Sequence, residues 1–184
     1  MRKIYLFFFI IAVNYATAQN KNYTISMDGL GLLKLGMTQT EVEKVMNKKI
    51  LLAKSLDTVN SFFEDTAKLI YKNIPVQLEF HRSYSNSDMR LIGIRANSSL
   101  CKTATGIGVG TDKLKIIAAY DNYHINLQPG FYNYYETEKG PGKSTISILD
   151  DAASAMEGPK AYTMIFYLLN KKVVSFELKA KFNE

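Results

Sequence analysis

The chain has 184 residues, no tryptophan, one cysteine and a formal net charge of +6 at pH 7. This length suffices for one compact domain or two closely packed units. The basic residues are scattered rather than gathered into a run, which argues against a nucleic-acid groove. Cys101 has no second cysteine to pair with, so an intramolecular disulfide is excluded and the fold must rest on an apolar core.

The N-terminus has the pattern of a secretory signal peptide, assigned to residues 1–18. Arg2 and Lys3 form the charged start, residues 4–13 are apolar, and Ala-Thr-Ala before Gln19 is a small-x-small cleavage site. The apolar run is shorter than the about 20 residues that cross a bilayer, although a retained N-terminal anchor is the alternative. Cleavage would leave 166 residues with a net charge of +4 and no segment of transmembrane length. We therefore expect export to the periplasm or the exterior.

A short apolar stretch ends at Gly36 and turns at once into a predicted helix. Thr38 is the expected N-cap, and Glu41, three residues later, completes a capping box. The apolar face that follows at helical spacing consists of Val42, Val45 and Met46.

The same pattern recurs 74 residues later. Gly110 takes the place of Gly36, and Asp112 takes the place of Thr38 and is an equally good N-cap. The matching apolar positions are Ile116, Ala119 and Tyr120. The shared register indicates an internal duplication into residues 19–100 and 101–184, with chance similarity as the alternative.

Strand-like sequence follows each predicted helix. Apolar and polar residues alternate, or β-prone residues cluster, at residues 67–71, 74–81, 89–96, 144–149, 162–169 and 173–182. Lys72-Asn73 and the segment at 170–172 are the expected turns. We therefore predict an α+β fold of two tandem repeats, each a capped helix or helix pair packed on an antiparallel sheet.

The two motifs and the layout of helices and strands resemble the β-lactamase-inhibitor-protein-like fold. The stretch "LGMTQTEVEKVM", from Leu35 to Met46, is also similar to the start of the small outer-membrane assembly lipoproteins, which carry one such unit. Those inhibitors are disulfide-bonded and those lipoproteins are lipidated near the mature N-terminus, whereas this chain has only Cys101. The resemblance implies a tandem repeat fold and secretion rather than a particular activity.

Two glycine-rich stretches approach nucleotide-binding motifs without completing them. "GPGKS" at 140–144 would need glycine where Thr137 stands, and "GIGVG" at 106–110 would need glycine at Thr111. Both stretches are better explained as backbone turns.

The residues that carry chemistry are dispersed along the sequence. His81 and His124 belong to no metal-ligand pattern and are expected at the surface. Cys101 is expected to be buried and inert, and Asp150-Asp151 to form a solvated turn. We assign no catalytic residue, metal ligand or cofactor from the sequence.

Aromatic residues gather in the second half of the chain. The candidate binding surface consists of Tyr123, Phe131, Tyr132, Tyr134 and Tyr135, in a polar segment broken by Pro and Gly. Tyrosine is favoured at interfaces because it buries area yet keeps a polar tip. The alternative is that these rings cover the sheet of their own domain.

These features lead to three hypotheses of function. The first is a secreted or periplasmic, non-enzymatic protein that binds another envelope or secreted protein, or a ligand, through open sheet faces and the Tyr-rich segment. The second is an envelope-assembly accessory protein. The third is a hydrolase with a dispersed site, in which Asp150 or Asp151 acts with His124.

Overall fold

The computed structural model describes residues 21–54, 64–82, 88–132, 137–150 and 161–181, so the predicted signal peptide lies outside it. The first elements are the 3-10 helix η1 (Lys21–Tyr23), β1 (Thr24–Ser26), β2 (Gly29–Leu30), β3 (Leu33–Lys34), α2 (Gln39–Met46), β4 (Ala53–Lys54), β5 (Glu64–Tyr71), β6 (Ile74–Arg82) and β7 (Met89–Ala96). They are followed by β8 (Lys102–Thr103), α3 (Lys113–Ala119), β9 (His124–Pro129), β10 (Phe131–Tyr132), β11 (Thr137–Glu138), β12 (Lys143–Asp150), β13 (Ala161–Leu169) and β14 (Lys172–Lys181).

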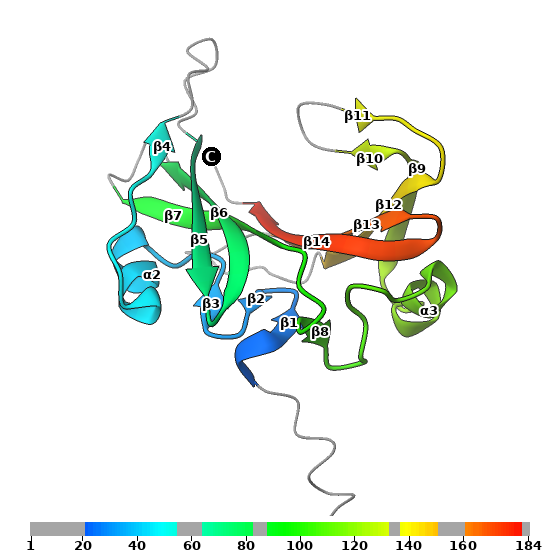
Figure 1. Cartoon of the computed structure of the whole chain (residues 1–184), viewed down its shortest axis with the longest axis horizontal. Coiled ribbons are helices and arrows are strands. Elements are labelled where there is room, and N and C mark those ends of the chain that lie inside the picture. The colour runs from blue at the N-terminus through cyan, green and yellow to red at the C-terminus, as the bar shows by residue number, and fades with distance from the viewer. Residues whose placement is uncertain (1–20, 55–63, 83–87, 133–136, 151–160, 182–184) are drawn as a thin grey trace, which may run out of the picture.

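One large sheet forms the body of the molecule. Its eight strands follow the order β4-β5-β6-β7-β14-β13-β12-β9, and every neighbouring pair is antiparallel. Residues 19–100 supply β4 to β7, and residues 101–184 supply the other four strands. The two parts meet where β7 pairs with β14, so they share a single sheet (Figure 1).

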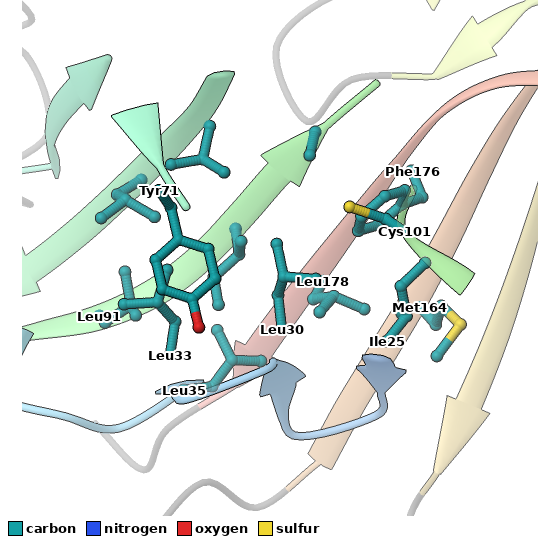
Figure 2. Close-up of a cluster of buried hydrophobic side chains, with 14 of the residues drawn as sticks. Ile25, Leu30, Leu33, Leu35, Tyr71, Leu91, Cys101, Met164, Phe176 and Leu178 are labelled. Carbon is teal, nitrogen blue, oxygen red and sulfur yellow. The ribbon is translucent and has the colours of Figure 1, made fainter. Parts of the chain in front are cut away.

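A small sheet of order β3-β2-β1-β8 covers one side of the large sheet. Strand β1 pairs in parallel with β8, whose residues lie 78 positions further along the chain. Figure 2 shows Ile25, Leu30 and Leu33 of the small sheet facing side chains of the large one, among them Leu178. Tyr71 is buried in this layer, and its hydroxyl accepts a hydrogen bond from the Leu32 N–H at 3.0 Å. The main core therefore lies between two sheets.

The predicted fold class, α+β with two helix-on-sheet repeats, is wrong. The described chain is mostly β-structure, and its two α-helices have only eight and seven residues. Each helix contributes one fully buried side chain, Val42 or Ile116, so neither carries the broad apolar stripe that covering a sheet requires. The small sheet takes that place instead, and α2 and α3 lie beside it (Figure 1).

The helix starts themselves are confirmed. Thr38 caps α2 with the full capping box to Glu41, and Asp112 caps α3. Gly36 and Gly110 adopt φ of 92° and 89°, values that glycine reaches without strain. Each donates its N–H at 2.8 Å to the start of a central strand, Gly36 to Leu91 and Gly110 to Val173. The local chemistry of capping was therefore predicted correctly, although the architecture was not.

The predicted strands are also confirmed as local elements. All six fall on β5, β6, β7, β12, β13 and β14, with ends that agree within three residues over the described part of the chain. The tight turns at Lys72-Asn73 and Asn170-Lys171 have positive φ at both residues, as two-residue hairpins require.

Candidate functional site

The side of the large sheet that faces away from the small sheet is here called the open face. Strand β6 illustrates how it arises, because Val76, Leu78 and Phe80 enter the core while Gln77 and Glu79 point the other way. Within the described residues, both α-helices lie on the core side, and the open face borders the top of Figure 1. The hairpin β10–β11 reaches over one end of this face.

Five side chains from four neighbouring strands form a polar cluster at the centre of the open face. This open-face cluster consists of Glu79, Arg95, Tyr167, Glu177 and Lys179. Tyr167 is 1% exposed and Glu177 is 7% exposed, yet neither belongs to the main apolar core. A buried acid and a buried phenol on the face opposite the core are the most unusual feature of the molecule.

The charges of the cluster are linked by hydrogen bonds and ion pairs. The Tyr167 hydroxyl donates a hydrogen bond to Glu177 Oε2. Lys179 Nζ lies 3.3 Å from Glu79 Oε2 and 3.7 Å from Glu177 Oε1. Lys179 thus bridges the Glu79 and Glu177 carboxylates, and Glu177 also accepts the hydrogen bond from Tyr167.

The ring of Tyr167 is held between two other side chains. The Arg95 guanidinium lies 4.5 Å from the ring centroid on one side, and Phe131 of β10 makes an edge contact with a centroid distance of 5.6 Å. Burial, followed by the nearby Glu177 carboxylate, raises the pKa of Tyr167 well above its usual value. The phenol therefore stays protonated and acts as a hydrogen-bond donor rather than as a base.

A glycine allows two long side chains to meet across an intervening strand. Gly93 pairs with Glu79 on one side and Lys179 on the other, and a Cβ on it would lie 2.7 Å from Glu79 Oε2. Glycine at this point leaves the room that the ion pair between Glu79 and Lys179 occupies.

A groove of about 520 Å³ adjoins the cluster, within the range of small-ligand sites. This cationic groove is lined by Lys48, Lys68, Leu69, Ile70, Pro75, Val76, Gln77, Arg95, Ala96, Asn97 and Ser175. Arg95 belongs to both the cluster and the groove. Three of the described lining residues are basic and none is acidic, so the groove suits an anionic group.

The predicted aromatic surface is only partly described. Tyr123 is 43% exposed and packs against Tyr120, whereas Phe131 packs on Tyr167. They stand at opposite ends of the six-residue strand β9 and so do not form one cluster. Tyr134 and Tyr135 lie outside the described residues, and the side chain of Tyr132 is likewise not described. The proposed surface as a whole stays a prediction.

The residues of the hydrolase hypothesis are not brought together where they can be placed. His124 pairs with Leu149, and Asp150 follows on the opposite side of β12, so His124 and Asp150 face different sides of the sheet. Asp151 lies outside the described residues. His81 stands on the open side of β6, as expected.

Cys101 is fully buried, as predicted, and burial raises the pKa of its thiol to about 11, so its inertness toward thiol reagents stays a prediction with this support. The glycine-rich stretches are turns, as predicted. Gly108 bridges to Lys102, and Gly142 turns with φ of 74° just before β12.

Within the described residues, no helix is long and apolar enough to cross a membrane, and no three His, Cys, Asp or Glu side chains gather as metal ligands. Sequence reasoning missed the open-face cluster, although the alternation in residues 173–182 had placed Glu177 and Lys179 on one side of a strand. No protein-family model, curated protein or solved structure matches this chain significantly.

Proposed function

We propose that this is an exported, non-enzymatic binding protein and that the open face of the large sheet is its recognition surface. The observation that carries the proposal is the open-face cluster. The ion pairs of this cluster are only partly buried, and even a fully buried ion-pair network can often be replaced by apolar residues with no loss of stability. Its presence on the face opposite the core therefore favours a role in recognition over a role in folding.

The groove and the exposed residues beside it support the same surface. Ile70 is 65% exposed within the groove, next to its cross-strand partner Pro75. Apolar side chains beside fixed charges are typical of sites that bind a partner, because the former supply affinity and the latter supply orientation.

The alternatives have less support. An envelope-assembly accessory protein would use the same surface and differ only in its partner. A hydrolase would need a carboxylate or imidazole in the groove to act as general base for a nucleophile or a water molecule. Its described lining residues offer basic, amide and hydroxyl side chains, but no carboxylate or histidine.

A matched pair of variants tests the surface. Ile70 on the open face and Leu114 on α3 are both large, exposed apolar residues, at 65% and 72% exposure. Proteins captured from the native envelope by mature wild type, Ile70→Asp and Leu114→Asp are compared by quantitative mass spectrometry. We expect Ile70→Asp to lose the specific partner and Leu114→Asp to retain it. Equal capture by both variants, or loss with Leu114→Asp alone, would exclude the open face.

Export is tested separately by N-terminal sequencing of protein recovered from outside the cytoplasm. We expect a chain that starts at Gln19, after cleavage at Ala18. A chain that keeps Met1 would contradict the signal peptide.

A further inference from the structure

The basic and polar side chains of the cationic groove have few partners of their own. In the parts of the chain that the structure describes, the side chains of Lys68, Gln77 and Ser175 make no hydrogen bond or ion pair. Arg95 has one contact, the ring of Tyr167, and no described carboxylate lies within ion-pair distance of its guanidinium. The other charged members of the open-face cluster, by contrast, are paired, since Lys179 lies between the Glu79 and Glu177 carboxylates. The donors of the groove are thus available to a ligand.

These donors form a straight row across three strands. Lys68 on β5 pairs with Gln77 on β6, which pairs with Arg95 on β7. Since strands in a sheet are about 4.8 Å apart, the stems of Lys68 and Arg95 stand about 10 Å apart, with the amide between them. An extended chain that lies across the strands would meet all three side chains in turn.

Arg95 is the anchor of this row because it is held in place before any ligand arrives. The buried Tyr167 ring supports one face of its guanidinium, and the Tyr167 hydroxyl is in turn fixed by Glu177. A guanidinium whose plane is fixed can present two parallel N–H donors to a carboxylate at little further cost in side-chain entropy.

The neighbouring residues define the rest of the ligand. Ile70 and Pro75 form an apolar wall beside the row. The formal net charge of +4 that remains after removal of the predicted signal peptide draws acidic partners from a distance. We propose that the cationic groove binds an acidic peptide segment of a protein partner. One carboxylate of that segment lies on Arg95, and an adjacent apolar side chain lies on Ile70 and Pro75. This rests on the proposed function, which it narrows to a chemical class of partner.

The test selects binders from a random heptapeptide display library with the mature protein as bait. Enriched peptides are synthesised, and their affinities are measured by fluorescence anisotropy for wild type, Arg95→Gln, Lys68→Gln and Lys115→Gln. Lys115 is exposed on α3, so its variant removes the same charge far from the groove. Lys68 is also exposed, so Lys68→Gln keeps the test valid if Arg95→Gln unfolds.

We expect the enriched peptides to contain Asp or Glu next to an apolar residue. Arg95→Gln should weaken their binding by about tenfold or more, the effect of losing a charge-assisted bidentate contact. Lys68→Gln should weaken it by about threefold, and Lys115→Gln should leave it unchanged. Equal weakening by Lys68→Gln and Lys115→Gln would reveal mere charge attraction and overturn the proposal.

Two further outcomes would also overturn it. The first is enrichment of peptides that contain no acidic residue. The second is that free glutarate binds as tightly as the peptides, because the groove would then be a site for a small carboxylate. If partner capture still depends on Ile70 in these cases, the recognition surface stands and only the acidic-peptide inference fails. Both fail together if Ile70→Asp has no effect on capture.

Discussion

The hydrogen bond between Tyr167 and Glu177 gives the most direct test of how the open-face cluster is organised. Tyr167→Phe removes the hydroxyl and keeps the ring between Arg95 and Phe131. Glu177 is 7% exposed, so water cannot easily replace the lost donor. A hydrogen bond to a buried charge contributes about 1.5–3 kcal/mol, and we expect the free energy of unfolding to fall by about 2 kcal/mol.

Urea unfolding of the mature protein measures this change. With a denaturant slope of about 2 kcal/mol per molar, the midpoint should fall by roughly 1 M. Tyr123→Phe is the matched control, because Tyr123 is 43% exposed and the described structure gives its hydroxyl no hydrogen bond. Its effect should stay within about 0.5 kcal/mol.

A double-mutant cycle assigns the loss to this contact. Glu177→Gln replaces the carboxylate by a neutral amide of the same shape. In the Glu177→Gln protein, Tyr167→Phe should therefore lower the free energy of unfolding by clearly less than it does in the wild type. If Tyr167→Phe leaves the midpoint unchanged, or if its effect is the same in both backgrounds, the buried hydrogen bond has no energetic role and our account of the cluster is wrong.

Three further predictions concern other parts of the chain. Thr38→Ala should lower stability by about 1 kcal/mol in urea melts through loss of the α2 cap, and an unchanged midpoint would refute that role. The Thr38 backbone N–H donates to the Glu41 carboxylate and lowers its pKa below the ordinary 4.5. Glu41 therefore stabilises the fold above pH 4.5, and this stabilisation is lost as the pH falls through the lowered pKa. Glu41→Gln should flatten the dependence of stability on pH below about pH 4.5, and a dependence identical to that of the wild type would contradict this. Because the pKa of Cys101 is raised to about 11 and its side chain is buried, a thiol reagent at pH 8 should label it only after unfolding, and rapid labelling of folded protein would show that the thiol is accessible.

Sequence reasoning succeeded where a structure depends on residues close together in the chain. Alternation located the long strands, and the spacing of Thr38 and Glu41 gave the capping box, because both patterns report contacts within a few residues. The same local signals predicted the turn at Lys72-Asn73.

The fold class failed because the layer that covers the core is made of very short strands. Residues 24–34 hold three strands of two or three residues, and these are too short to show any periodicity. Their pairing with β8 depends on residues far along the chain. The helices have clear capping residues and apolar spacing in the sequence, and for this reason the sequence predicts that they cover the sheet.

Sequence reasoning missed the open-face cluster for a related reason, since its members come from β6, β7, β13 and β14 and share no local motif. Each residue taken alone is an ordinary polar position on an alternating strand. Only the register of four strands places Glu79 beside Lys179 and Arg95 beside Tyr167. A sequence shows which face of a strand a residue occupies, but not which residue it meets across the sheet.

Gly93 at the centre of the sheet connects this register to the proposed recognition surface. Gly93 weakens a central strand, because glycine brings entropy loss and no packing there. Gly93 does not adopt a positive φ that would require glycine, so the reason for it lies above the sheet, where the Glu79 carboxylate crosses toward Lys179. At this point the chain has a glycine where a β-branched residue would stabilise the strand better. What is gained in return is a fixed arrangement of charges on the open face, and the proposed binding role would depend on that rigidity.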